Sequence, residues 1–146
     1  MENILLCYPR SGSTWVRYII EHFTNKATIG GYDVPLAVEQ SILNLNTPSI
    51  LTRKHEWNNN WSQQNNRVLL LIRNYKECII RNMQDIMPIS IEMLNGSIAG
   101  NNYFNYIIPI INFHEFIGQK QVIYYEDLIQ NHEIEIKKYL AFLNLK

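Results

Sequence analysis

Short apolar stretches that do not alternate with polar residues are the feature that most constrains the fold of this chain. Residues 3–8 (NILLCY) and 67–72 (RVLLLI) are almost entirely apolar. Strands with one solvated face alternate apolar and polar residues, whereas continuous apolar strands are typical of parallel sheets that helices cover on both faces. The sequence therefore predicts a sheet that is buried from both sides.

Segments with helical periodicity separate the apolar stretches, so strands and helices alternate along the chain. We expect strands at 3–8, 49–54, 67–72 and 120–125, and helices at 14–24, 35–44, 75–84 and 132–144. Residues 88–117 are expected to be mostly helical, with a kink or a split at Pro109. This order predicts an α/β fold, a three-layer α/β/α arrangement with about four parallel strands in a single domain over residues 1–146.

Length and charge limit the classes of function. A chain of 146 residues can form one domain with a sizeable core, but not two. Thirteen basic and thirteen acidic residues balance, so there is no overall positive field for nucleic acid or an anionic membrane, and any anion site must be local. No targeting segment is visible, and no apolar run approaches the roughly 18–20 residues that span a bilayer. We expect a cytoplasmic protein that binds neither nucleic acid nor membranes.

The loop after the first predicted strand is rich in small polar residues and reads PRSGSTW. A loop between a strand and a helix brings several backbone N–H groups to the positive end of the helix. Gly12 allows an anion to approach the backbone, Ser13 and Thr14 add hydroxyl donors, and Arg10 adds a positive charge. The loop is therefore predicted to hold a phosphate-like group. The alternative is an ordinary helix cap by Ser11, Ser13 or Thr14.

This loop differs from the phosphate loop of kinases and GTPases, G-x-x-x-x-G-K-[ST]. Cys7 stands in place of the first glycine and Ser13 in place of the lysine. Such enzymes use an acidic residue at a strand end to hold Mg²⁺, but the third predicted strand ends in Arg73. We therefore expect a ligand with two separated anionic groups and no metal. Cys7 and Cys78 lack metal-ligand spacing and are expected to be buried, reduced thiols.

Polar segments lie at the carboxyl end of each predicted strand. They are Pro9–Trp15, Arg53–His55, Arg73 and Tyr124–Asp127. Because ligands of parallel α/β sheets bind beyond the carboxyl ends of the strands, we expect these segments to converge on one site.

Four segments together resemble motifs of the sulfotransferase family. YPRSGSTW (8–15) is similar to the family's 5'-phosphosulfate-binding loop, usually Y-P-K-S-G-T-T-W, and RVLLLIRNYKECIIR (67–81) to its 3'-phosphate-binding segment. RKH (53–55) resembles the K-T-H that carries the catalytic histidine, and YYEDL (124–128) resembles the Y-E-D-L near the adenine pocket. The segments occur in the family's order, and the resemblance runs from about residue 3 to about residue 130.

The resemblance implies a sulfotransferase that moves a sulfuryl group from 3'-phosphoadenosine-5'-phosphosulfate (PAPS) to a hydroxyl or amine of a small-molecule or glycan acceptor, without a metal. It implies that His55 is the catalytic base, with Glu56 in reserve, and that Arg53 contacts the transferring group. Arg10 takes the place of the loop lysine and would stabilise charge on the leaving phosphate. A solvated loop histidine is the alternative for His55.

The nucleotide-binding residues implied by the resemblance are Arg10, Ser11, Gly12, Ser13, Thr14, Trp15, Arg73, Arg81 and Tyr125. Trp15 would stack on adenine, or pack in the core. Arg73 would pair with the 3' phosphate, or form a surface ion pair. Arg81 stands where the family has a serine, and it could contact the ligand or be solvated. Tyr125 could touch adenine or belong to the core.

Two other functions remain open. No counterpart of the family's later R-K-G segment is found in these 146 residues, so a non-catalytic module of the same fold that binds a nucleotide is one alternative. A P-loop nucleotide kinase is the other, and a requirement for a metal would identify it.

Overall fold

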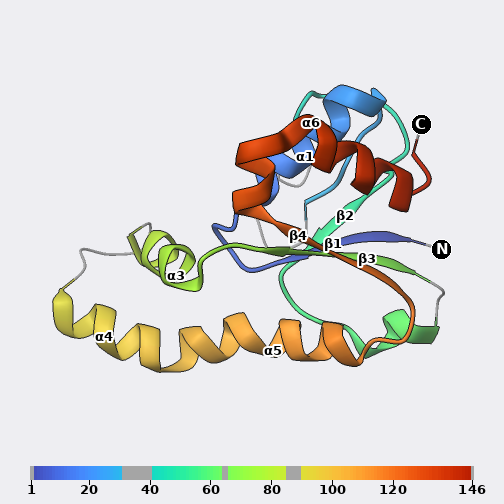
Figure 1. Cartoon of the computed structure of the whole chain (residues 1–146). Helices are drawn as coiled ribbons and strands as arrows, with labels where there is room; N and C mark the ends of the chain where they lie inside the picture. Colours follow the sequence, from blue (N-terminus) through green and yellow to red (C-terminus); the bar gives the residue numbers. More distant parts are fainter. Residues whose placement is uncertain (1, 31–40, 64–65, 85–89, 146) are drawn as a thin grey trace.

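A single parallel sheet organises the computed structural model, which describes residues 2–30, 41–63, 66–84 and 90–145 (Figure 1). Its four strands are ordered β2-β1-β3-β4, and every neighbouring pair is parallel. The strands are β1 (Asn3–Cys7), β2 (Thr52–Lys54), β3 (Arg67–Ile72) and β4 (Gln119–Tyr124). This arrangement confirms the predicted α/β fold and its strand count.

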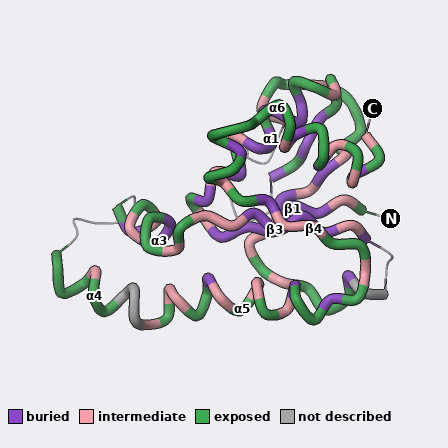
Figure 2. The backbone as a smooth tube through the Cα atoms, viewed as in Figure 1, coloured by how far each residue is buried: buried purple, intermediate pink, exposed green. Residues whose placement is uncertain are grey.

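Helices cover both faces of the sheet, as Figure 1 shows. They are α1 (Ser13–Thr24), α3 (Tyr75–Gln84), α4 (Ile91–Ala99), α5 (Asn101–Glu115), α6 (Tyr125–Phe142) and the 3₁₀ helix η1 (Asn59–Gln63). Leu5 and Cys7 of β1 pack in one apolar cluster with residues of α1 and α6. Ile4 and Leu6 point the other way, into a cluster with residues of α5 and η1. The central strands β1 and β3 are consequently the most buried, whereas β4, at the edge of the sheet, has one buried residue (Figure 2).

The strand order places a topological switch at the carboxyl end of β1. The chain leaves β1 toward β2 on one side, and it leaves β3 toward β4 on the other. In open α/β sheets the loops that diverge at such a point leave a crevice between them, and ligands bind there. The loop after β1 and the residues after β3 therefore flank the expected binding position.

The segment between α1 and β2 departs from the prediction. A helix was expected at 35–44, and residues 31–40 lie outside the described part of the chain. In the described remainder, residues 41–44 form a turn in which the Asn44 N–H donates to the Ser41 carbonyl. Thr52 is also the first residue of β2, which is shorter than the expected strand at 49–54.

The predicted break at Pro109 is wrong, because α5 continues through this residue. Pro109 removes one N–H donor from the helix, but its fixed φ is compatible with helical backbone. The helix breaks instead at Gly100, between α4 and α5. A Cβ on Gly100 would lie 2.6 Å from the Gly96 carbonyl oxygen, so the absence of a side chain allows this close turn.

The last helix begins earlier than predicted. Helix α6 follows β4 directly and starts at Tyr125, whereas the sequence predicted a strand through 125 and a helix from 132. The expected start lies near a kink at Asn131, whose φ of −142° and ψ of 50° are not helical. Glu126 and Asp127 consequently lie in the first turn of α6, where a negative charge is favourable.

Three further features concern residue types rather than topology. Cys7 and Cys78 are buried and unpaired, and burial raises the pKa of Cys78 to about 11. Within the described ranges, no three His, Cys, Asp or Glu side chains form a group that could hold a metal ion. None of the described helices combines the length and the apolar character needed to cross a bilayer.

Candidate functional site

The loop between β1 and α1 has a strained backbone. Gly12 is the N-cap of α1 and has a left-handed φ of 98°, which favours glycine. Arg10 also has a positive φ, 65°, and such a conformation is costly for a residue with a Cβ. No described side chain caps the first turn of α1, so the ordinary-cap interpretation is wrong. The Trp15 N–H donates to the Gly12 carbonyl at 3.0 Å, so the N–H groups of Ser13 and Thr14, at the positive end of α1, are the ones placed to bind an anion.

The three hydroxyl residues of the loop have different positions. Ser11 is fully buried, and both its N–H (3.3 Å) and its Oγ (2.7 Å) donate to the Tyr8 carbonyl. It thus closes the turn that shapes the loop. Ser13 is buried and Thr14 is exposed. Of the three hydroxyls, that of Thr14 is the most accessible to a ligand.

Tyr125, the first residue of α6, packs its ring against the loop at Gly12. A Cβ on Gly12 would lie 2.6 Å from Cε2 of the Tyr125 ring, so only glycine permits this approach. The Trp15 ring meets Tyr125 edge to face, with 5.9 Å between the centroids. Both rings pack partly against the cluster beneath α1 and α6. The loop and the start of α6 are thereby joined by aromatic packing.

Arg73, the first residue after β3, joins three of the segments that the sequence predicted to converge. Its guanidinium lies over the Tyr125 ring, 4.1 Å from the centroid, and its Nη1 donates to the Arg10 carbonyl at 3.4 Å. Its Nη2 forms an ion pair with Glu77 Oε2 at 2.7 Å. Only 11% of the side chain is exposed. An anion that binds here would compete with the half-exposed Glu77 carboxylate for the same guanidinium.

His55 lies immediately after β2 and contacts the end of β1. Its Nδ1 is 2.7 Å from the Cys7 carbonyl oxygen and 3.6 Å from Cys7 Sγ. A carbonyl oxygen can only accept, so Nδ1 carries the proton of the neutral ring. The lone pair that a base needs is then on Nε2. His55 is half-buried.

Arg53 is a buried cation with unsatisfied donors. The residue is 5% exposed and lies in the middle of β2, opposite Leu5 of β1. Among the residues that the structure describes, Arg53 Nε and Nη2 have no hydrogen-bond partner. Because unsatisfied donors on a buried charge are costly, this guanidinium fits a site where an anionic ligand supplies the missing acceptors.

A second buried arginine, Arg17 of α1, was missed by the sequence interpretation. Its Nε donates to Thr28 Oγ1 (2.9 Å) and its Nη2 to the Thr28 carbonyl (3.1 Å). Burial, together with the nearby charge of Arg53, lowers the pKa of Arg17 to about 10. Two positive charges therefore lie close together under α1.

Glu21, one helical turn after Arg17, is fully buried as well. Its carboxylate accepts hydrogen bonds from the Thr28 N–H (2.9 Å), Thr28 Oγ1 (2.5 Å), Ser41 Oγ (2.8 Å) and the Leu43 N–H (2.8 Å). Burial alone would raise the pKa of Glu21, but these bonds outweigh it and hold the pKa below its ordinary value. The i, i+4 spacing of Arg17 and Glu21 is a local trace of this network, but ordinary surface ion pairs on helices have the same spacing.

Other predicted residues lie outside this arrangement. Arg81 is exposed in the last turn of α3, and Glu56 is exposed after β2. Glu126 Oε1 accepts a hydrogen bond from the Asn74 N–H at 3.2 Å, which ties the start of α6 to the residue after Arg73.

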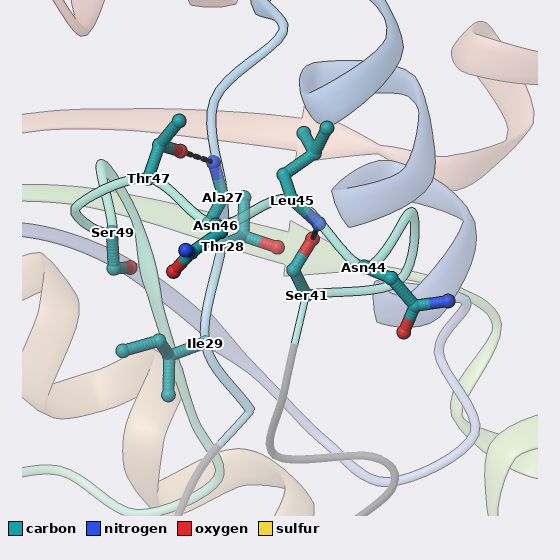
Figure 3. A pocket seen from close by; sticks show the side chains of 9 residues that line it. All are labelled: Ala27, Thr28, Ile29, Ser41, Asn44, Leu45, Asn46, Thr47 and Ser49. Atoms are coloured by element: carbon teal, nitrogen blue, oxygen red, sulfur yellow. Dashed lines mark hydrogen bonds between the residues drawn. The ribbon is translucent and has the colours of Figure 1, made fainter.

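A cavity of about 350 Å³ opens beside the outer edge of β2, where Ile29 pairs with Thr52 (Figure 3). Its lining contains hydroxyl, amide and apolar side chains, contributed by Ala27, Thr28, Ile29, Ser41, Asn44, Leu45, Asn46, Thr47 and Ser49. Thr47 Oγ1 accepts from the Ala27 N–H and Ser41 Oγ from the Leu45 N–H, so these hydroxyls hold the loop together. The lining carries no charge, which distinguishes it from the arginine-rich edge of the sheet.

Comparisons with known proteins bear on the fold. Neither a family model nor a curated protein sequence matches this chain. Mouse sulfotransferase SULT7A1 complexed with PAP is similar in structure, with a TM-score of 0.69 at 16% identity over 99% of this chain and 58% of the mouse chain. The sulfotransferase domain from the curacin biosynthetic pathway gives a TM-score of 0.59 at 14% identity, over 99% of this chain and 74% of that domain. The chain thus has a sulfotransferase-like fold and spans 58% of the length of the mouse protein.

Proposed function

We propose that this chain is a sulfotransferase that transfers a sulfuryl group from PAPS to a hydroxyl or amine of a small-molecule or glycan acceptor. The observation that carries the proposal is Arg53, a buried guanidinium whose Nε and Nη2 lack acceptors among the described residues. It lies on β2, two residues before His55, in a fold shared with a sulfotransferase that was solved with PAP. An anionic group of the donor would supply the missing acceptors.

The arrangement at the ends of β1 and β3 supports a donor with two anionic groups. The first turn of α1 and Thr14 would receive the 5' phosphosulfate, with Arg10 beside the leaving phosphate. Arg73 would bind the 3' phosphate in place of Glu77. Trp15 and Tyr125 offer aromatic surface for the adenine. The residues present thus fit the nucleotide at both of its charged ends.

The proposed reaction uses His55 as the base. Nε2 would take the proton from the acceptor hydroxyl as the acceptor oxygen bonds to sulfur, and the bond from sulfur to the phosphate oxygen would break. The electron pair of that bond leaves on adenosine 3',5'-bisphosphate. Arg10 and Arg53 would stabilise the charge that develops on the leaving phosphate and on the transferring group. Glu56 is the reserve base.

A nucleotide-binding module without turnover is the second candidate. What favours it is that the contacts at the loop and at Arg73 support nucleotide binding by themselves, in a fold shared with a sulfotransferase that was solved with PAP. This module would bind the nucleotide through the same contacts at Arg73 and the loop, but it would not need His55 as a base.

Calorimetry with adenosine 3',5'-bisphosphate tests binding. We expect the affinity to be unchanged by EDTA and to exceed that for adenosine 5'-monophosphate and ATP, because Arg73 would read the 3' phosphate. Binding that needs Mg²⁺, or a preference for ATP, would refute the sulfotransferase and favour the nucleotide kinase.

Transfer from ³⁵S-labelled PAPS tests catalysis. The acceptors should include sugars, phenols, steroids and tyrosine peptides, since the described residues do not identify the acceptor. Label on any acceptor that depends on the protein supports the enzyme. Tight nucleotide binding with no transfer to any acceptor would favour the binding module.

A further inference from the structure

The outward face of α5 is apolar. Tyr106 and Phe113 are 8% and 2% exposed on the face toward the sheet, whereas Phe104, Ile108 and Ile111 are 55%, 48% and 49% exposed. At about 100° per residue, the three exposed side chains fall within roughly 60° of one another, opposite the buried pair. We call Phe104, Ile108 and Ile111 the α5 stripe.

Charged residues are absent from all but the last turn of this helix. From Asn101 to Phe113 the sequence contains no Lys, Arg, Asp or Glu. The exposed side of α5 also carries the amides of Asn101, Asn105 and Asn112, but the α5 stripe itself is apolar, and the sheet covers the opposite face of the helix (Figure 1). Amphipathic helices that bind membranes carry Lys and Arg on their polar face, and this helix has none. A protein surface is therefore the occupant that fits the α5 stripe.

We infer that the α5 stripe is the interface of a dimer of this chain, with α5 packed antiparallel on α5 of the second copy. A two-fold axis near Ile108 would place Phe104 against Ile111 of the partner subunit, so that one surface complements itself. The inference does not rest on the proposed sulfuryl transfer.

The ends of α5 support the antiparallel arrangement. Its first turn contains no acidic residue, and Gly100 provides no side-chain cap, so the positive end of the helix dipole is not compensated there by its own side chains. Glu115 is the last residue of α5. In an antiparallel pair centred near Ile108, this carboxylate would lie beside the amino end of α5 in the second copy, where a negative charge is favourable.

Sedimentation equilibrium over a concentration series tests the inference. We expect a reversible dimer in the micromolar range, and Ile108→Glu should weaken it by at least about tenfold, because it would bury an unpaired carboxylate in the interface. Ile134→Glu is the matched control, because Ile134 is 59% exposed on α6. A wild-type chain that is monomeric at every concentration, or an equal effect of both variants, overturns the inference. Circular dichroism verifies that each variant is folded.

Cross-linking provides a second test that does not perturb the interface with a charge. Cys7 and Cys78 are 1% and 0% exposed, so an introduced surface thiol would be the reactive one. With a short bis-maleimide, Ile108→Cys should give a covalent dimer and Ile134→Cys should not. Equal yields from both variants, or no dimer with Ile108→Cys, overturn the inference.

Discussion

The Cys7 carbonyl fixes the tautomer of His55, because Nδ1 lies 2.7 Å from that oxygen and must donate to it. The acceptor is a backbone atom at the end of the central strand β1, so the ring is held by the sheet itself. The geometry therefore leaves the lone pair of the neutral ring on Nε2, the atom that the proposed reaction uses as the base, and it holds the ring beside the loop that follows Cys7.

His55→Ala should separate binding from catalysis. Loss of the base should lower sulfuryl transfer by about 10²–10⁴-fold while the affinity for adenosine 3',5'-bisphosphate stays nearly constant. In the wild type, the single-turnover rate should fall as the pH is lowered and the imidazole takes up a proton. His114→Ala, an exposed histidine on α5, is the control. If the His55→Ala protein keeps the wild-type rate, His55 is not the base and Glu56 becomes the candidate.

Arg73→Ala should discriminate between nucleotides. The loss of one charge-assisted contact should weaken adenosine 3',5'-bisphosphate by about 1.5–3 kcal/mol and adenosine 5'-monophosphate far less. Calorimetry on both ligands measures this difference. Arg67→Ala, at the opposite end of β3, should leave both affinities unchanged. Equal weakening of the two ligands by Arg73→Ala would mean that this residue does not read the 3' phosphate.

Two buried arginines should respond to the same substitution with opposite signs. Arg53→Met removes a buried charge whose Nε and Nη2 lack partners among the described residues, so the free energy of unfolding should stay constant or rise by up to about 2 kcal/mol. Arg17→Met removes the bonds to Thr28 and should lower it by about 1–3 kcal/mol.

Urea unfolding of the ligand-free variants measures both effects, and Arg53→Met should also abolish sulfuryl transfer. If Arg53→Met destabilises the fold as much as Arg17→Met, then Arg53 is a structural residue, and the main support for the anionic ligand is lost.

Glu21 should make the fold sensitive to acid. Its pKa in the folded state is held below the ordinary value of 4.5, so its contribution to stability is complete above about that pH and is lost as the pH falls through the lowered value. Glu21→Gln should reduce the free energy of unfolding at neutral pH by about 1–3 kcal/mol and flatten its decline in acid.

Denaturant unfolding over a pH series measures this dependence. Glu133→Gln, on the exposed side of α6, should leave the curve unchanged. An acid-side slope that is the same in the wild type and in Glu21→Gln would contradict the role given to this carboxylate.

Features encoded in short stretches of sequence were predicted well. The apolar run 67–72 and the helical pattern at 75–84 coincide with β3 and α3, because burial on both faces and a 3.6-residue period each leave a local signature. The parallel sheet brings Arg10, Arg73 and Tyr125 together, since their segments all follow strands. The roles of the site residues remain predictions.

Features that depend on contacts between distant segments were not predicted. Pro109 carries the stronger local breaking signal, yet the helical stretch is divided into α4 and α5 at Gly100, where the close approach of the Gly96 carbonyl requires a glycine. Arg17 and Glu21 have the spacing of an ordinary surface ion pair, and only the loop carrying Thr28 and Ser41 explains their burial. Side-chain partners supplied from elsewhere in the chain leave no periodic pattern in the sequence.

The central position of β1 fixes the distance between the two sides of the candidate site. The strand of His55 and the strand of Arg73 lie on opposite sides of β1, so two strand spacings, about 10 Å, separate them. This interval is set by backbone hydrogen bonds and does not depend on the loops that connect the strands. The spacing between His55 and Arg73 should therefore be retained when the lengths of the connecting loops vary.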